Sequence, residues 1–110
     1  MADNNDNNDN NGIDITLNCL IVPIGRFFDL PSNQVAQTIT INTRQRVSAL
    51  EEAIREQLEP PFDRLHLRVR EIRQGTGNKR PMDFQDYISD YFNNQSQLRA
   101  NRFHVTAYSL

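Results

Sequence analysis

The sequence predicts a single α+β domain in which one short amphipathic helix packs on one face of a mixed sheet. The chain has 110 residues, a length typical of one domain. One segment has the three- and four-residue spacing of a helix, and several others alternate between apolar and polar residues as half-buried strands do. A short helix buries its apolar side against a second layer, and these strands supply that layer.

The first two strands are expected at residues 13–22 and 35–41, joined as a hairpin. In both, odd-numbered positions are mostly apolar and even-numbered positions mostly polar. The loop between them carries Gly25 and the run Pro31–Asn33, which are turn signals. The side chains expected in the core from these two strands are Ile13, Ile15, Leu17, Cys19, Ile21, Val35, Ile39 and Ile41.

A helix is expected to begin at Ser48 and to end before Pro60–Pro61. Ser48 and Glu51 have the spacing of a capping box, in which a hydroxyl and a carboxylate accept hydrogen bonds from amides of the first turn. Proline disfavours helical geometry in the residue before it, so the pair stops the helix. The apolar side of the helix is expected to consist of Leu50, Ala53, Ile54 and Leu58.

A third strand is expected at residues 65–70 and the last strand at residues 102–108. The polar run Arg73–Arg80 reads as a loop, with a short fourth strand near residues 79–82. Alternation predicts that these side chains face the core: Leu65, Leu67, Val69, Phe103, Val105 and Ala107. It predicts that these face away from it: His66, Arg68, Arg70, His104, Thr106 and Tyr108.

The run DYISDYF, at residues 86–92, holds three aromatic rings and two acids. Asp86 is a credible N-cap of a short turn, and the apolar side chains after it share one side of that turn. A small domain without tryptophan needs these rings as core volume, so we expect packing rather than partner binding.

Hairpin, helix and returning strands follow one another in the order of the ubiquitin-like β-grasp, a mixed sheet of four to five strands with one main helix. In that architecture the first and last strands pair in parallel at the centre of the sheet. A short turn just before the last strand closes one end of the core, and residues 86–92 occupy that position.

The first twelve residues, MADNNDNNDNNG, hold almost nothing that a core can bury, so residues 1–12 are expected to form a disordered Asn- and Asp-rich arm. The folded domain is then expected at residues 13–110. The formal net charge of -2 argues against broad binding to nucleic acid or to an anionic membrane. No apolar run is long enough to span a bilayer, and the N-terminus lacks the basic start and apolar block of a secretory signal.

Catalytic and metal-binding groups are scarce. Cys19 is the one cysteine, and its apolar strand favours a buried, unreactive thiol over a reactive one. His66 and His104 are candidate neighbours on the sheet, but neither a cysteine nor a carboxylate cluster accompanies them to bind a metal. No nucleophile stands beside a base. The sequence therefore predicts a non-catalytic domain without a metal or a cofactor.

The sheet face opposite the helix is the expected partner surface. Its basic and aromatic candidates, His66, Arg68, Arg70, His104 and Tyr108, suit an acidic protein surface. The alternative is a solvated face that binds nothing.

Phe27 and Phe28 form a second candidate, in the loop between the first two strands. Two adjacent rings can hardly both point into the same core, so one of them is expected in solvent. An exposed ring makes the loop an anchor for a partner.

Five residue runs, taken in chain order, match one family. They are Ile15–Val22, Val47–Ile54, Phe62–Leu67, the run ISDYF that ends at Phe92, and Phe103–Val105. Together they resemble the N-terminal ubiquitin-like domain of Crinkler effectors. The resemblance covers about residues 13–108 and depends on the order and spacing of the runs rather than on one motif.

Crinklers are modular proteins of oomycetes, some fungi and other eukaryotes. The resemblance implies a header domain associated with secretion and entry into host cells, while separate C-terminal domains usually act in the host nucleus. It therefore implies a secreted protein in virulence or symbiosis, with a host protein or a second copy as partner.

The third strand departs from the oomycete pattern. Oomycete members carry an LxLFLAK motif there, whereas this chain reads LHLRVRE at Leu65–Glu71. Arg68, Arg70 and Glu71 replace Phe, Ala and Lys, so the resemblance fits a fungal or other divergent member better.

Two other functions stay open on the sequence. One is a resident intracellular adaptor that recognises an acidic protein through the same basic strand. The other is an enzyme, for which the sequence offers no arrangement of catalytic groups.

Overall fold

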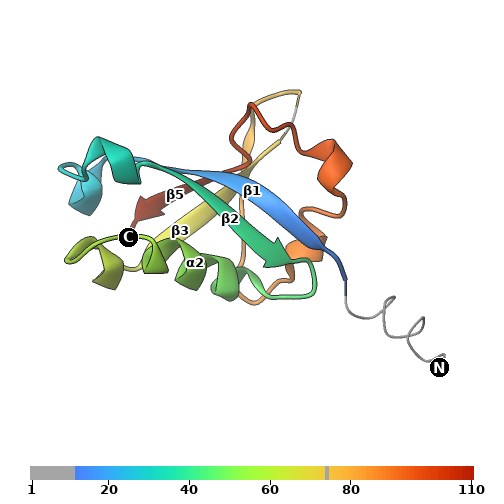
Figure 1. Ribbon diagram of the computed structural model, residues 1–110, viewed down its shortest axis with the longest axis horizontal. Helices are drawn as coiled ribbons and strands as arrows, with labels where there is room; N and C mark the ends of the chain where they lie inside the picture. Colours follow the sequence, from blue (N-terminus) through green and yellow to red (C-terminus); the bar gives the residue numbers. More distant parts are fainter. Residues whose placement is uncertain (1–11, 74) are drawn as a thin grey trace.

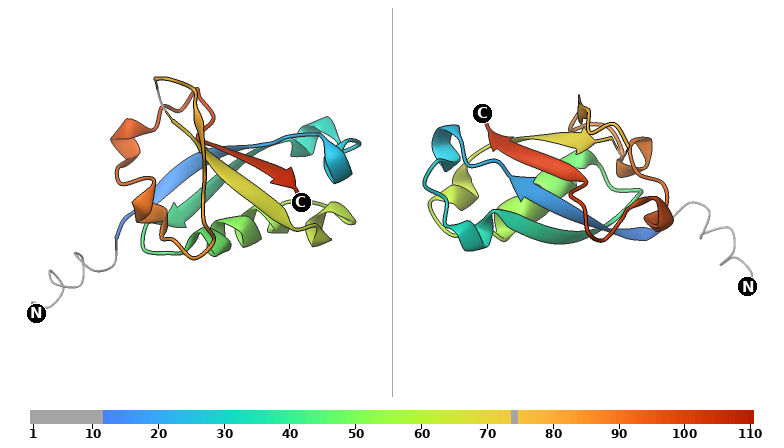
Figure 2. Two further views of the ribbon diagram at one scale, coloured as in Figure 1. Left: turned by 180° about the vertical axis from the view of Figure 1, so that it is seen from behind. Right: turned by 90° about the horizontal axis from the view of Figure 1, so that it is seen from above.

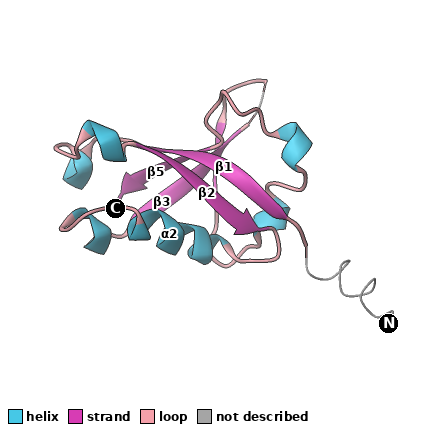
Figure 3. Ribbon diagram, in the orientation of Figure 1, coloured by secondary structure: helices cyan, strands magenta, loops and turns pink. Residues whose placement is uncertain are grey.

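The computed structural model describes residues 12–73 and 75–110 and gives them a β-grasp-like α+β fold (Figure 1). The strands are β1 (Asp14–Ile21), β2 (Ala36–Asn42), β3 (Leu67–Ile72), β4 (Lys79–Pro81) and β5 (Val105–Ser109), and the main helix is α2 (Val47–Glu56). They form one five-stranded sheet in the order β2-β1-β5-β3-β4, with α2 along one face (Figure 3). The predicted fold class is confirmed.

The first and last strands are neighbours inside the sheet and run parallel, as the sequence predicts. Their pairing is short and runs from Cys19 opposite Val105 to Ile21 opposite Ala107. β2 pairs with the other edge of β1, and β3 pairs with the other edge of β5, both antiparallel. The parallel pair therefore joins two antiparallel ribbons into one mixed sheet.

The core lies between α2 and the inward side of the sheet. In the right-hand view of Figure 2, α2 lies behind the strands of the sheet. Leu50 and Ile54 of α2 are fully buried. Burial of such a side chain contributes about 1.5–3 kcal/mol. The strand side chains that form the other half of the core are Ile15, Leu17, Cys19, Ile21, Ile39, Ile41, Leu67, Val69, Val105 and Ala107.

The start of α2 differs from the prediction. The helix begins at Val47, and the capping box expected at Ser48 and Glu51 does not form. The first turn uses a distant acceptor instead, because the amide of Val47 donates to the carbonyl of Asp86 at 2.8 Å. A backbone segment far along the chain thus caps α2.

Glu51 has a tertiary role rather than a capping role. Its side chain is buried, and Oε2 accepts a hydrogen bond from the amide of Leu67 at 3.2 Å. The carboxylate satisfies a buried amide at the start of β3 and connects α2 to that strand.

The segment at residues 86–92 packs into the core, in the position expected for the closing turn. It forms a 3-10 turn at Ile88–Asp90. Ile88 and Phe92 are buried and Tyr91 is half-buried, whereas Tyr87 is exposed. The prediction of packing is confirmed for all of these rings except that of Tyr87.

The prediction that Asp86 caps this turn is wrong. Tyr87, not Asp86, is the N-cap, and its amide donates to Oδ2 of Asp90 at 2.9 Å. Asp86 instead accepts the hydroxyl of Tyr91 at 2.6 Å. The guanidinium of Arg80 lies 4.6 Å from the centre of the Tyr91 ring, so β4 covers the turn.

Four strand side chains expected in the core are not fully buried. Ile13 is 48% exposed and Phe103 is 38% exposed, whereas Val35 and Leu65 are half-buried and pack against the core. Each of them precedes the first paired residue of its strand, since β3 begins at Leu67 and β5 at Val105. Alternation in the sequence continues past the point where a neighbouring strand ends, so it does not locate the first paired residue.

Two expectations fall partly outside the described residues. Residues 1–11 of the predicted disordered arm, 1–12, lie outside the described residues. Gly12 is described, has a φ of +70° and packs closely against the turn at residues 42–44. Residue 74, in the predicted loop at 73–80, is also outside the described residues. β4 begins within that predicted loop, at Lys79. None of the helices in residues 12–73 and 75–110 has the length and apolar character needed to cross a membrane.

The observed start of α2 predicts a clear loss of stability for one substitution and almost no change for another. Glu51→Ala should lower the free energy of unfolding by about 1–3 kcal/mol, because it leaves the buried amide of Leu67 without an acceptor. Ser48→Ala should change it by less than about 0.5 kcal/mol, because the hydroxyl caps nothing. Urea denaturation measures both, and a larger loss for Ser48→Ala would restore the capping box.

Candidate functional site

The candidate site lies on the sheet face opposite α2, where β3 meets β5. Arg68 lies directly across from Tyr108 in the antiparallel register, and Arg70 lies across from Thr106. Side chains of directly opposed residues share one face of a sheet. The structure therefore brings together three of the predicted site residues, Arg68, Arg70 and Tyr108.

Arg70 and Tyr108 form a fixed pair on this face. The guanidinium of Arg70 lies 4.8 Å from the centre of the Tyr108 ring, and its Nε donates to the Tyr108 hydroxyl at 2.8 Å. A guanidinium so placed is attracted by the ring and by the hydroxyl at once. The pair is half-buried and holds a charge and an aromatic ring in one orientation.

Two hollows flank this pair. One has a volume of about 370 Å³ and is lined by Arg68, Arg70, Pro81, Met82, Phe84 and Tyr108 among others. The other has a volume of about 190 Å³ and is lined by Val22, Ile24, Arg70, Lys79, Thr106 and Tyr108. Both combine apolar walls with cations, so each suits an apolar side chain that has an acidic neighbour.

Lys79 and Ile24 belong to this surface, although neither was predicted for it. Lys79 lies opposite Ile72 in the register of β3 and β4, which places it on the same side of the sheet as Arg70. Ile24 is 57% exposed at the end of β1. If the start of β4 and its register with β3 had been known, the alternation of β3 would have placed Lys79 on the same side of the sheet as Arg70. Nothing in the sequence around Ile24 indicates that it folds over the sheet.

His104 is not part of an open surface, contrary to the prediction. Its side chain is only 1% exposed. Nδ1 accepts a hydrogen bond from the amide of Asn18 at 2.9 Å, and the other ring nitrogen, Nε2, lies 2.9 Å from the carbonyl oxygen of Arg99. Since Nδ1 accepts, the ring is neutral and carries its proton on Nε2, which donates to Arg99. The imidazole replaces a strand neighbour that β1 lacks at this point.

Burial lowers the pKa of His104, and the hydrogen bond to Arg99 opposes that shift. A second proton on Nδ1 would face the amide of Asn18, donor against donor. The folded chain therefore favours neutral imidazole, which is a structural group here rather than a partner-binding one.

The two histidines are not neighbours. The carbonyl of His66 accepts the amide of Leu110, after the end of β5, while the carbonyl of His104 accepts the amide of Ile72, at the end of β3. They therefore lie at opposite ends of the β3–β5 pair, about 20 Å apart along the strands. His66 is exposed and lines a separate hollow with Arg26 and Arg64.

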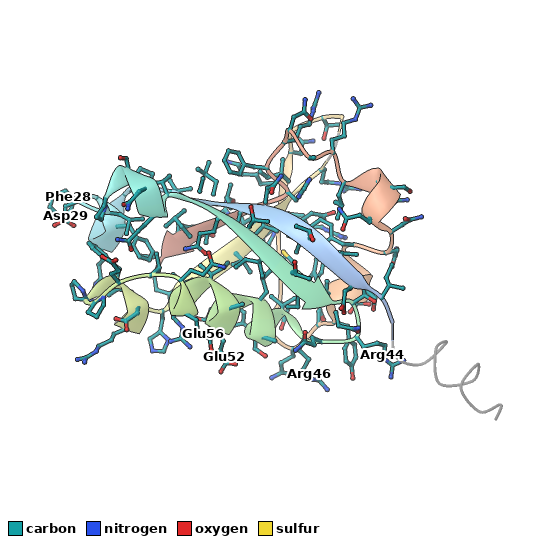
Figure 4. The ribbon with its side chains drawn as sticks, in the orientation of Figure 1. Phe28, Asp29, Arg44, Arg46, Glu52 and Glu56 are labelled. Carbon is teal, nitrogen blue, oxygen red and sulfur yellow. The ribbon has the colours of Figure 1, made fainter. Side chains whose placement is uncertain are left out.

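Phe27 and Phe28 divide as the sequence predicts, one ring inside and one outside. Phe27 is fully buried and packs against Phe62, with ring centres 6.1 Å apart. It is a core residue, so its place among the partner-binding candidates is wrong. Phe28 is 75% exposed, and Figure 4 shows it with Asp29 at the tip of the loop between β1 and β2.

Other reactive groups are withdrawn into the fold. Burial raises the pKa of the Cys19 thiol to about 12, so it stays protonated and unreactive at neutral pH. Within the described ranges, no three side chains among His, Cys, Asp and Glu are grouped to hold a metal ion.

No protein-family model matches this chain, and a search of curated proteins finds no match. The resemblance to Crinkler domains therefore stays a prediction based on the residue runs. The β-grasp-like fold and the positions of Arg68, Arg70 and Tyr108 are the structural observations from which a function is proposed.

The burial of His104 predicts a loss of stability in mild acid. The pKa of His104 is lowered on folding, so the unfolded chain takes up the proton first as the pH falls. The contribution of His104 to the free energy of unfolding is therefore fully present above the unfolded pKa of about 6.5. It declines as the pH falls below that value, until the folded-state pKa is passed. Urea denaturation at a series of pH values between these limits measures the decline.

His104→Gln is the matched variant for this experiment, because it removes the titrating ring and keeps a polar side chain. It should be less stable at neutral pH and should lose less stability on acidification than the natural chain. An equal loss in both proteins would show that other groups cause the acid sensitivity.

Proposed function

We propose that this chain is the ubiquitin-like domain of a secreted Crinkler-type effector, and that it acts in secretion, entry into a host cell and protein contact. The residue runs that resemble the family support this proposal. The β-grasp-like fold supports it too, because the resemblance implies that fold. A host protein or a second copy of the chain is the partner that this role requires.

The contact role depends on one observation, the Arg70–Tyr108 pair between two hollows with apolar walls and cations. Aromatic and arginine side chains supply most of the binding energy in protein interfaces, above all where a pocket excludes water. Three cations, Arg68, Arg70 and Lys79, line the two hollows on this part of the sheet. The partner surface that fits is therefore acidic and carries an apolar side chain.

The departures from the oomycete motif contribute to this surface. Arg68 and Arg70 stand where that motif has Phe and Ala, and both line the larger hollow. Glu71, at the third departure, accepts Nε of Arg80 at 2.8 Å and so fixes β4 against β3. A chain that kept the motif would have an apolar surface here, so the difference favours recognition of an acidic partner.

The domain is proposed to be non-catalytic. The two side chains with the most suitable chemistry, Cys19 and His104, are buried and hold the fold together. The charged groups on the candidate surface are arginine and lysine, which bind anions.

The second candidate function is a resident intracellular adaptor that uses the same surface to bind an acidic protein. The same Arg70–Tyr108 pair favours it, because an adaptor needs such a surface and no delivery route. The two functions differ in where the chain is found, so location decides between them.

The contact role predicts binding of a synthetic peptide in which one leucine is flanked by glutamates. In an NMR titration of the full chain at low concentration, the shift changes should cluster at Arg68, Arg70 and Tyr108. Arg68→Glu should weaken binding about tenfold, because it puts a like charge beside the peptide.

Arg44→Glu is the control, because Arg44 is also an exposed cation, lies on the turn before α2 (Figure 4) and lines neither hollow. It should leave the affinity almost unchanged. Equal losses for both variants would mean that overall charge attracts the peptide and that no site exists.

The delivery role predicts that a tagged chain leaves the cells that produce it and enters host cells. Secretion and uptake assays measure both steps. An adaptor would stay inside the producing cells, and that result would overturn the delivery role while leaving the contact role intact.

A further inference from the structure

We propose that the exposed Phe28–Asp29 tip of one chain binds the larger hollow beside Arg68 on a second copy of the same chain. The inference rests on the proposed function, because the hollow is part of the proposed contact surface. It goes further by naming the partner and the two residues that enter the site.

Phe28 is a prominent apolar side chain on an anchored loop. It is 75% exposed, the largest exposed fraction among the large apolar side chains of the described residues. The loop below it is held to the fold, because Phe27 is fully buried and the amide of Arg26 donates to Oγ of Ser109 at 3.1 Å. A ring held in this way loses little conformational freedom on binding, so its burial favours association.

The backbone of this loop depends on glycine. Gly25 has a φ of +58°, and a Cβ atom there would lie 2.7 Å from Oγ of Ser109. The chain can therefore approach β5 closely at this point and turn the next residues outward. Phe27 then points into the core, and Phe28 points into solvent.

The larger hollow fits a phenyl ring. Its volume is about 370 Å³, and Pro81, Met82 and Phe84 supply apolar walls. An apolar cavity of about 150 Å³ is enough to hold benzene, so the hollow has room for a ring and part of the backbone that carries it. Methionine adapts its shape to an aromatic ring and makes favourable sulfur contacts with it.

Charge complements shape. Asp29 follows Phe28 directly and has no hydrogen-bond or ionic partner among the described contacts, and Figure 4 shows it beside Phe28 at the tip. Arg68 lines the hollow and is exposed, so a ring in the hollow would bring Asp29 near a free guanidinium. Asp83 is the one acidic side chain in the lining, where Arg68 and Arg70 outnumber it.

A second copy is the partner that these features select. The tip of a chain is in solvent and does not fill its own hollow, so the ring must come from another molecule. An acid beside the ring disfavours an anionic membrane, where basic residues accompany inserted apolar side chains. Because the tip and the hollow are different parts of the surface, successive copies can bind head to tail in an open chain. A closed dimer forms instead if the tip of each copy binds the hollow of the other.

The test is sedimentation of the full chain from micromolar to millimolar concentration. The natural chain should associate reversibly as its concentration rises, and Phe28→Ala should weaken association about tenfold or more. Phe28→Ala should fold normally, because the ring is in solvent. Ile13→Ala is the matched control, since Ile13 is also an exposed apolar side chain, at 48%, but lines neither of the two hollows.

A charge exchange tests the pairing itself. Asp29→Arg and Arg68→Asp should each weaken association, and the two changes in one chain should restore it. A mixture of Phe28→Ala with Arg68→Glu should form mixed complexes, because the first variant keeps an intact hollow and the second keeps an intact tip.

Three results would overturn the inference. They are a natural chain that stays monomeric at millimolar concentration, undiminished association of Phe28→Ala, and a monomer whose Phe28 mediates binding to phospholipid vesicles. If a monomeric chain still binds the acidic leucine peptide, the inference alone fails and the contact role stands. If peptide binding is absent as well, both fail.

Discussion

The short parallel contact between β1 and β5 is the constraint on which the rest of the structure depends. It joins strands from opposite ends of the chain over the stretch from Cys19–Val105 to Ile21–Ala107. β5 in this place gives β3 its neighbour, and that pairing sets Arg70 beside Tyr108. Without the parallel contact the chain would hold two separate ribbons, and neither alone would cover the apolar side of α2.

Because β5 is short, polar side chains complete the edge of β1. The amide of Thr16 donates to Oε1 of Gln95 at 2.6 Å, and His104 accepts the amide of Asn18. At the free edge of β2, Gln57 donates to the carbonyl of Thr38 at 3.3 Å. Unpaired strand edges invite other strands to add, so these side chains protect the sheet against unwanted association.

The two layers leave different surfaces. On the helix side, Glu52 and Glu56 are exposed on α2, as Figure 4 shows. On the opposite side, Arg68, Arg70 and Lys79 gather around Tyr108. A chain with a net charge of -2 can therefore still present a local cationic surface, because the fold gathers three cations on one part of the sheet.

The sequence by itself determined the fold class, the helix, the parallel central strands and the cationic side of β3. The helix and the cationic side of β3 follow from periodicity, which requires only that one face of each element be buried. The parallel pairing follows from the order of the elements, which is that of the β-grasp. The tertiary structure alone decided where pairing begins and what covers each side chain, which is why Phe103 is exposed and His104 is buried. It also decided that Glu51 serves Leu67 rather than the helix start. Hydrogen-bond partners far apart in the chain compete with local ones, and only the folded packing fixes which partner is closer.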